Sequence, residues 1–240
     1  MEKKYGAKNF IQYKVYGKYA LFTNPITKIG GEKSSYHLPT YEALRGITEA
    51  VYWKPTFEWI IDKVRVMKPI QTETKSIKLR NYASRNSDLA MFTYLSDVEY
   101  RVFAHFEWDE SRSDLEKDRD ELKHFSLANR YLNKGGKRDV FLGARECVAY
   151  VEPCDFDEGE GFYDQVPEIN FGAMFHSFTY PKTSQDEKLM SNLWTAVMRK
   201  GVVDFVRPEE CPVKRTVRNY AFNKVEVSPE REKCEAEVLE

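Results

Sequence analysis

The order of strand-like and helix-like segments constrains the fold of this chain more than any other sequence feature. Residues 11–23, IQYKVYGKYALFT, are rich in β-branched and aromatic side chains and alternate apolar with polar positions, which predicts a strand. A helical pattern follows over residues 40–53, where Leu44, Ile47 and Val51 recur at helical spacing. The chain therefore begins with a strand and a helix, separated by a long loop.

The next hundred residues continue this alternation. A second helix is predicted over residues 114–133, capped by Ser113 or Asp114 and ended by Gly135 and Gly136. Residues 68–82 are polar and basic, which favours an exposed hairpin. The remaining segments read as strands, over residues 57–67, 90–95, 100–108, 140–142 and 146–151. This order predicts an α+β fold close to a ferredoxin-like (RRM-like) βαββαβ unit with an inserted basic β-hairpin.

The C-terminal third differs in composition. Residues 152–168 form an acidic loop, and two strand patterns follow it at 170–180 and 193–205, which predicts a small separate antiparallel β-sheet. We therefore predict three parts: a ferredoxin-like domain over 1–151, a small C-terminal β domain over 152–225, and a mobile tail over 226–240.

Composition excludes several classes of protein. With 42% hydrophobic and 14% aromatic residues in 240, the chain can bury a sizeable core and is not predominantly disordered. No run reaches the roughly 18 apolar residues that a membrane span requires, and the mean hydropathy is −0.62. The first ten residues lack the apolar core of a signal peptide, so we expect a cytoplasmic protein with no membrane partner. Four scattered cysteines without a CxxC pair argue against structural zinc and a disulfide framework.

The net charge of −1 conceals an asymmetry along the chain. Residues 1–90 carry 16 lysines and arginines against 8 acidic residues, whereas residues 91–240 carry 21 against 30. A basic half beside an acidic half is typical of a polyanion-binding face, although charges clustered on solvated loops give the same count.

The second predicted helix carries the first candidate for chemistry. On a wheel of 100° per residue, one face gathers Leu122, Phe125, Ala128 and Leu132, which we expect to pack on the core. The opposite face then gathers Lys123, His124, Leu127, Arg130 and Tyr131. An exposed His–Lys pair could cleave RNA, with the imidazole moving protons and the ammonium stabilising the phosphorane; a solvated helix face is the alternative.

The polar hairpin supplies the candidate RNA contacts. Cations bind phosphates and aromatic rings such as Tyr82 stack on unpaired bases. Lysines that protect an exposed sheet edge are an equally good explanation. With Arg130 of the helix, the predicted RNA-binding residues are Lys68, Lys75, Lys78, Arg80 and Arg85.

No metal or cofactor site is predicted. The acidic loop lacks the Glu that closes a calcium loop at its twelfth position, and loop solvation explains its charge. His37, His105 and His176 are each isolated in sequence and are predicted to be structural. The motifs GxSxG, HExxH and GKS or GKT are absent.

Several segments together resemble a known family. The stretches KVYGKYALFTNP, SYHLPTYEALRGITEAVYWKP, FEWIIDKVRVMKPIQ, ELKHFSLANRYL and DVFLGARECVAYV are similar to the Cas-five family of CRISPR-associated proteins, in its subtype I-C (Dvulg, d-type) branch. The resemblance extends over most of residues 10–220. Its specificity lies in the combination of a Tyr that opens the first helix, the Lys-His pair and the FLGAREC turn.

This resemblance implies a function and a site. In the I-C branch the family member cleaves the repeat of precursor CRISPR RNA and stays in the interference complex, where it holds the 5′ end of the crRNA. The active-site set carried over from the motifs PTYEALRGI and ELKHF is Tyr41, Lys123 and His124. The implied reaction is metal-independent transesterification by a 2′-hydroxyl, with no cofactor. The implied partners are the repeat hairpin and the other complex subunits; whether duplex DNA is also bound is left open.

Two other functions stay open from the sequence. A non-catalytic crRNA-binding scaffold would need the same basic surface without the catalytic set. A metal-dependent nuclease would use the acidic loop and would be inhibited by EDTA.

Overall fold

Two β-sheets and two α-helices make up the fold in the computed structural model, which describes residues 8–27, 32–80, 87–181 and 188–219. The larger sheet is antiparallel except where a two-residue strand pairs in parallel, and the smaller sheet is fully antiparallel. The predicted α+β class and the second small sheet are both confirmed.

The larger sheet has the strand order β10-β3-β5-β1-β7-β6, with β2 and β4 added along β5. Two of its central strands, β1 and β3, correspond to the strands predicted over 11–23 and 57–67, and their inward residues are almost completely buried. The strands are β1 (Phe10–Ala20), β2 (Lys33–Ser34), β3 (Phe57–Val66), β4 (Thr72–Arg80), β5 (Ser87–Trp108), β6 (Val140–Phe141), β7 (Val148–Pro153) and β10 (Val202–Asp204).

The smaller sheet comes from the C-terminal third, in the order β11-β9-β8. Its strands are β8 (Ile169–Thr179), β9 (Lys188–Met198) and β11 (Val213–Asn219), and a short 3-10 helix, η3 (Pro208–Glu210), lies before β11. The predicted strand over 193–205 is wrong in its length: β9 ends at Met198, and β10 pairs with β3 of the larger sheet instead. The predicted tail over 226–240 lies outside the described residues.

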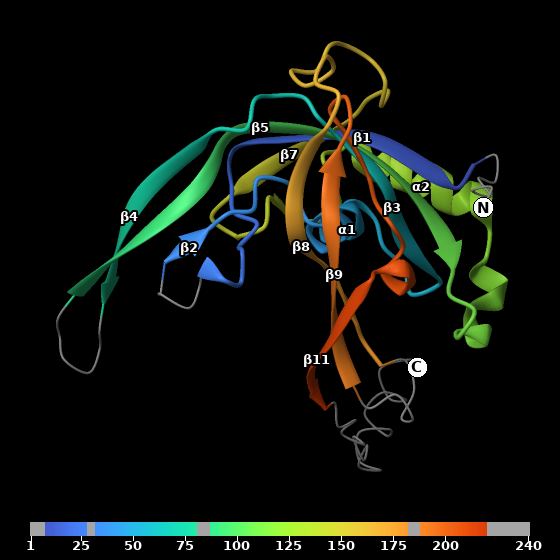
Figure 1. Ribbon diagram of the computed structural model, residues 1–240. Coiled ribbons are helices and arrows are strands. Elements are labelled where there is room, and N and C mark those ends of the chain that lie inside the picture. The colour runs from blue at the N-terminus through green and yellow to red at the C-terminus, as the bar shows by residue number, and fades with distance from the viewer. Residues whose placement is uncertain (1–7, 28–31, 81–86, 182–187, 220–240) are drawn as a thin grey trace.

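Helix α1 (Tyr41–Val51) contacts β3 of the larger sheet and β8 of the smaller one, so it links the two (Figure 1). Thr40 caps its N-terminus by accepting a hydrogen bond from the Ala43 amide at 3.2 Å. Leu44, Ile47 and Val51 are buried, as their spacing predicts. No helix in the described residues is both long enough and apolar enough to span a membrane.

The second helix begins later than predicted. A separate 3-10 helix, η2 (Ser113–Asp118), precedes α2 (Glu121–Leu132), and Asp120 caps α2 by accepting from the Lys123 amide at 3.0 Å. Asp120 is therefore the helix N-cap, in place of Ser113 or Asp114. On the predicted wheel His124 lies only about 40° from Ala128, so the wheel divided one buried stripe between its two faces.

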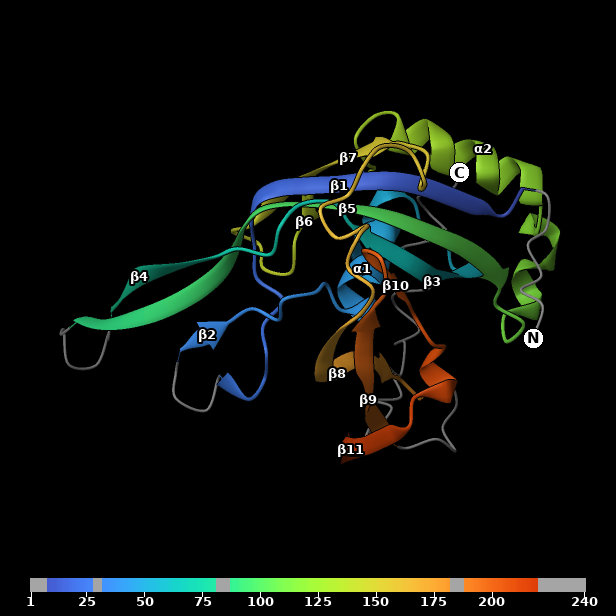
Figure 2. The same cartoon turned by 45° about the horizontal axis from the view of Figure 1, so that its top comes forward.

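Strand β5 is one continuous strand of 22 residues, where two short strands were predicted. The polar segment Ser96–Glu99 does not end it, because β1 keeps pairing there, with Tyr19 opposite Ser96 and Gly17 opposite Val98. Asp97 takes a positive φ of 51° at this point. The first half of β5 pairs with β4, and the two strands form an arm that projects from the body (Figures 1 and 2).

Close packing fixes the turn between β6 and β7. Gly143 has a φ of +87°, and a Cβ at this position would lie 2.2 Å from the Leu21 carbonyl oxygen. Only glycine fits both the backbone conformation and this approach. The turn therefore holds the edge of the larger sheet against the end of β1.

Candidate active site

The Lys-His pair lies at the start of α2, but its two side chains point in different directions. The Lys123 side chain is 47% exposed, whereas His124 is fully buried. The prediction that both lie on a free face is therefore wrong for His124, and Leu122, predicted to be core, is 55% exposed. The buried stripe of α2 is His124, Ala128 and Leu132, at intervals of four residues.

Both ring nitrogens of His124 are hydrogen-bonded. Nδ1 lies 2.9 Å from the Tyr52 hydroxyl, and Nε2 lies 2.7 Å from the Asp118 carbonyl oxygen. A carbonyl oxygen can only accept, so Nε2 carries a proton, and in the neutral ring Nδ1 accepts from Tyr52. This arrangement fixes the tautomer and the orientation of the imidazole.

Aromatic rings surround the buried histidine. The ring centroids of Phe57, Trp108 and Phe106 lie 5.1, 5.7 and 6.3 Å from that of His124. Tyr52 is 1% exposed, and burial, followed by the nearby charge of Asp118, raises its pKa to about 12. The hydroxyl of Tyr52 therefore stays protonated at neutral pH and can act as a hydrogen-bond donor to His124.

Asp118 connects the histidine to the lysine. Its carboxylate pairs with Lys123 Nζ and accepts a hydrogen bond from the Thr56 hydroxyl at 2.7 Å, and its Oδ2 lies 3.5 Å from His124 Nε2. The hydrogen bonds from Lys123 and then Thr56 lower the pKa of Asp118. Four polar groups, Tyr52, His124, Asp118 and Lys123, thus form one connected network.

Tyr41 lies at the other end of α1 from this network. It is 1% exposed, its ring stacks on His176 at 4.4 Å, and Phe205 packs edge-on against it at 5.7 Å. Tyr41 opens α1 and Tyr52 caps its C-terminus, so the two backbones are about 16 Å apart at the rise of an α-helix. The structure brings Tyr52 to the pair and places Tyr41 elsewhere. The aromatic pair Tyr52-Trp53 directly before Lys54-Pro55 is the sequence signal that was missed.

The predicted RNA contacts do not share one face. Along β4, Lys78 and Arg80 point to the same side of the arm and are exposed, whereas Lys75 points to the opposite side with its Nζ 3.5 Å from the Tyr19 ring. Lys68 pairs with Asp97 at 2.7 Å.

The remaining two predicted contacts are Arg130 and Arg85. Arg130 is exposed on α2, distant in sequence from the arm, and Arg85 lies outside the described residues.

The acidic loop wraps two arginines of the larger sheet. Arg65 pairs with Asp164 at 2.6 Å and donates to the Gly159 carbonyl at 3.0 Å, while Arg101 donates to the Asp155 carbonyl at 2.8 Å. Backbone carbonyls that accept from a buried guanidinium explain why this loop is fixed against the sheet. Asp164 is the loop carboxylate that pairs with Arg65, whereas the acidic side chains of Asp155, Asp157, Glu158 and Glu160 are exposed, as loop solvation predicts.

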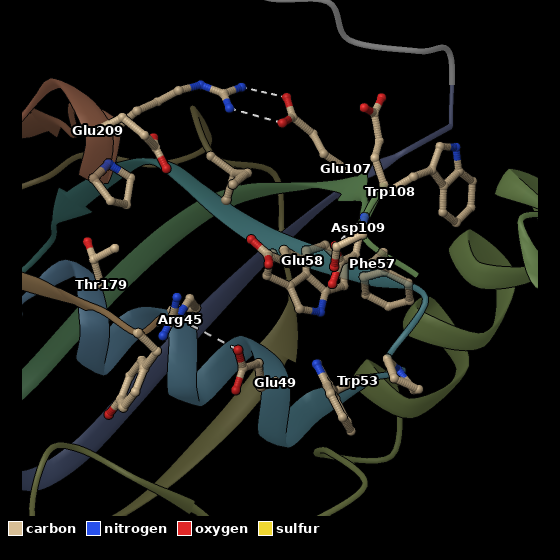
Figure 3. Close-up of a pocket in the computed structure, with 18 of the residues that line it drawn as sticks. Arg45, Glu49, Trp53, Phe57, Glu58, Glu107, Trp108, Asp109, Thr179 and Glu209 are labelled. Carbon is tan, nitrogen blue, oxygen red and sulfur yellow. Dashed lines mark hydrogen bonds and ion pairs between the residues drawn. The ribbon is translucent and has the colours of Figure 1, made fainter. Parts of the chain in front are cut away.

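A groove of about 770 Å³ opens next to the network, between α1, the ends of β3 and β5, and the smaller sheet (Figure 3). Phe57 and Trp108, which pack against His124, also line it. Its walls carry six carboxylate side chains and three arginines, so the groove is acidic overall: Glu49, Glu58, Glu107, Asp109, Glu110, Glu209, Arg45, Arg112 and Arg207.

A chain of charges crosses the back of the groove. Asp62 lies 2.6 Å from Nδ1 of buried His105, whose Nε2 lies 3.2 Å from Glu107, and Arg207 binds Glu107 through two nitrogens. Burial alone would lower the pKa of His105, but the hydrogen bond and charge of Asp62, with Glu107, raise it. The Arg207 hydrogen bond is the main reason that the pKa of Glu107 falls to about 2. These ion pairs tie η3 to β5.

Comparison with known proteins agrees with this geometry. Residues 10–206 match the Cas5d family model, described as CRISPR-associated protein (Cas_Cas5). A protein of Mannheimia succiniciproducens named CRISPR pre-crRNA endoribonuclease Cas5d is 28% identical over 223 residues, which cover 82% of this chain and 94% of that protein. A protein of the same name from Thermus thermophilus is 30% identical over 163 residues, covering 63% of this chain and 67% of that one.

Solved structures give the same result. A crystal structure of a CRISPR-associated protein is 38% identical, with a TM-score of 0.73 over 87% of this chain and 97% of that one. A functionally uncharacterized protein of Streptococcus mutans, SMU1763c, has the same identity and TM-score over 87% and 98% of the two chains. The fold is therefore that of a CRISPR-associated protein. The chain belongs to the Cas5d family, and the resemblance seen in the sequence is confirmed.

Proposed function

We propose that this protein is an endoribonuclease that cleaves the repeat of precursor CRISPR RNA and remains in the type I-C interference complex, holding the 5′ end of the crRNA. Both curated relatives carry the name CRISPR pre-crRNA endoribonuclease. The observation that carries the proposal is the network at the start of α2, in which an exposed Lys123 adjoins His124 with a fixed tautomer.

The reaction is transesterification within the RNA. The 2′-hydroxyl oxygen attacks the adjacent phosphorus, the bond from phosphorus to the 5′-oxygen breaks, and the products are a 2′,3′-cyclic phosphate and a 5′-hydroxyl. The 2′-hydroxyl loses its proton to solvent, and the 5′-oxygen gains a proton, which the Nε2–H of His124 can supply. Lys123 stabilises the extra negative charge on the non-bridging oxygens. These groups account for the chemistry without a metal or cofactor.

Lys123 and His124 are the proposed catalytic residues, and we assign the tyrosine role to Tyr52 rather than Tyr41. The Tyr52 hydroxyl orients His124 through Nδ1 and leaves Nε2 for proton transfer. At present Nε2 is covered by the Asp118 carbonyl in the segment from η2 to α2. None of the residues of η2 is buried, so little apolar packing holds this segment in place. RNA binding displaces it and exposes Nε2.

The proposed fold is the ferredoxin-like βαββαβ unit. In chain order β1, α1, β3, β5, α2 and β7 supply its six elements, and the strand order β3-β5-β1-β7 with antiparallel neighbours supports it. The arm formed by β4 and β5 is then the inserted hairpin. We keep the division at residue 151 as a proposal, and the pairing of β10 with β3 argues against a sharp boundary there.

The RNA path follows the basic side chains that remain exposed. Lys78 and Arg80 on one face of the arm and Arg130 on α2 are the proposed phosphate contacts, and Lys68, Lys75 and Arg85 complete the predicted set. Lys68 can bind RNA only after its ion pair with Asp97 breaks, so it is the proposed contact that contributes least to RNA affinity.

A non-catalytic scaffold is the second candidate, because His124 and Tyr52 are both buried. One assay separates the two functions. Repeat RNA is incubated with the purified protein, with and without EDTA, beside His124→Ala and a substrate that has a 2′-deoxy residue 5′ of the cut. The endoribonuclease cuts the natural RNA equally well with EDTA, and both His124→Ala and the deoxy substrate stay uncut. Binding without cutting by the parent protein would establish the scaffold.

A further inference from the structure

The acidic groove and the catalytic network share two walls. Phe57 and Trp108 line the groove, and their rings lie 5.1 and 5.7 Å from His124. When a phosphate of the RNA lies at Lys123 and His124, the base of an adjacent nucleotide is therefore close enough to enter the groove. Its volume of about 770 Å³ is in the range of a small-molecule site and is large enough for a nucleobase.

Trp53 offers a flat apolar surface in this groove. It follows Tyr52 directly, is 44% exposed and lines the groove close to the end that adjoins His124. Large apolar side chains left exposed beside a catalytic centre are candidates for ligand contact. An indole ring that is open on one side can stack on an unpaired base.

Glu49 stands beside this indole. Glu49 lies in the last turn of α1 and Trp53 two residues beyond its end, after the extended residue Tyr52, and both line the groove (Figure 3). Arg45, one turn earlier on α1, has its Nε 3.7 Å from a Glu49 oxygen, so the carboxylate stays charged at the wall of the groove. A base stacked on Trp53 would present its edge to Glu49.

The charge of the groove decides which part of the RNA can enter. Six carboxylates against three arginines repel phosphate, whereas carboxylate oxygens accept hydrogen bonds from the N–H groups of bases. A neutral base can therefore enter while its phosphates stay outside at the basic residues. Guanine presents N1–H and N2–H side by side to one carboxylate; adenine, cytosine and uracil each lack one of these adjacent donors.

We propose that this groove is a specificity pocket that takes an unpaired guanine next to the cleaved phosphate, stacked on Trp53 and read by Glu49. The inference rests on the proposed endoribonuclease function and names the part of the substrate that the site selects. Trp53 and Glu49 are then specificity-determining residues. The carboxylates of the groove keep phosphates out and accept hydrogen bonds from the base.

The test measures cleavage and binding on the same set of RNAs. Each unpaired nucleotide on either side of the cut in the repeat RNA is changed in turn to guanosine, inosine, adenosine or an abasic residue. Single-turnover rates at subsaturating protein are measured with the intact RNAs, and dissociation constants with their uncut 2′-deoxy forms. The variants are Trp53→Ala, Trp53→Phe and Glu49→Gln, with Tyr150→Ala and Glu160→Gln as controls. Tyr150 is a 60% exposed aromatic residue on β7, and Glu160 is an exposed carboxylate of the acidic loop that does not line the groove.

The expected result is a preference at one position. There guanosine is cut about tenfold faster than inosine, which lacks the N2 amine, and the abasic RNA is slower still. Trp53→Ala loses tenfold or more at that position, as removal of a stacking surface does, and Trp53→Phe recovers most of the loss. Glu49→Gln removes the difference between guanosine and inosine. Because the preference is a ratio, a variant that is merely less stable does not change it.

Other outcomes overturn the inference. If no position shows a base preference, or if Trp53→Ala behaves like Tyr150→Ala, the groove is not a base pocket. If Trp53→Ala instead weakens only the binding of another complex subunit, the acidic groove holds a basic protein segment. If the parent protein cuts none of the RNAs but still prefers guanosine in binding, the endoribonuclease function fails and the pocket stands.

Discussion

Replacement of Tyr52 by phenylalanine tests the assignment of the site most directly. The change removes one hydroxyl, which lies 2.9 Å from His124 Nδ1, and leaves the ring in its stack on Tyr131 at 5.7 Å. Tyr41→Phe is the matched control, because Tyr41 is equally buried on the same helix and stacks on His176. Tyr52→Phe removes a hydrogen bond to His124, whereas Tyr41→Phe removes none from His176, whose ring nitrogens bond Ser177 and the Val206 carbonyl.

The magnitude follows from the hydrogen bond. A buried acceptor left without its donor costs about 1–3 kcal/mol, so Tyr52→Phe lowers the melting temperature by roughly 4–8 °C for a loss of about 2 kcal/mol in a chain of this size. The fixed tautomer of His124 is lost at the same time. A deficit of about 1.4 kcal/mol in the transition state corresponds to a tenfold slower reaction. We expect Tyr52→Phe to cut at least tenfold more slowly and Tyr41→Phe to cut within about twofold of the parent.

The assay is single-turnover cleavage of repeat RNA across pH 5.5–8.5, with the melting temperature of each variant measured in parallel. A positioning role for Tyr52 also changes the pH profile, because the proton distribution on His124 is no longer set by the hydroxyl. Loss of stability alone would leave the profile unchanged. The reasoning is refuted if Tyr41→Phe is the slow variant and Tyr52→Phe is not, which would restore the site that the sequence predicted.

Three further predictions follow from the structure. The double variant Lys78→Glu, Arg80→Glu should flatten the slope of log affinity against log salt for repeat RNA. Lys75→Glu should change this slope less, because Lys75 lies on the opposite face, over the ring of Tyr19. The slopes are measured by filter binding from 50 to 200 mM salt, and equal slopes for the two variants would contradict the separation of faces. Burial lowers the pKa of His176 to about 4, below the ordinary value of 6.5 that applies to the unfolded chain. The stability that His176 contributes is therefore present above pH 6.5 and is lost as the pH falls toward 4. His176→Gln should lose less melting temperature over that range, and a curve identical to that of the parent would show that His176 is not responsible. Gly143→Ala should lower the free energy of unfolding by more than about 3 kcal/mol, because the new Cβ meets the Leu21 carbonyl and φ is positive. Gly46→Ala, on an open face of α1, should raise the free energy of unfolding by roughly 1 kcal/mol. Chemical denaturation measures both, and equal effects would disprove the packing argument.

The regular elements could be predicted from the sequence because their signals are local. Alternating apolar side chains identified β1 and β3, and the spacing of Leu44, Ile47 and Val51 identified α1 within two residues. That β5 is one continuous strand could not be predicted. Its polar segment Ser96–Glu99 stays in the sheet because it pairs with β1, which lies some eighty residues earlier in the chain. Long-range pairing overrode the local signal there.

The candidate site was only partly predictable for the same reason. The Lys-His pair was found from its residue types, but which stripe of α2 is buried depends on what packs against the helix. The end of α1 covers His124 with Tyr52, and this contact cannot be read from the sequence of α2. A tyrosine eleven residues from the expected one met the pair because the C-terminal end of α1, not its start, lies beside α2.

The single strand β5 spans two levels of local stability. Between Tyr100 and Phe106 it is flanked on both sides, by β1 and β3, and its inward residues are buried. Between Ser87 and Ala90 it has β4 as its antiparallel partner, and Leu89 is 69% exposed. Amide protons of the arm should therefore exchange quickly with solvent, through fraying of a two-stranded ribbon. Those beyond Tyr100 should exchange slowly, because their exchange requires the whole sheet to open. The arm can therefore bend or twist while the half of β5 that lies between β1 and β3 stays closed.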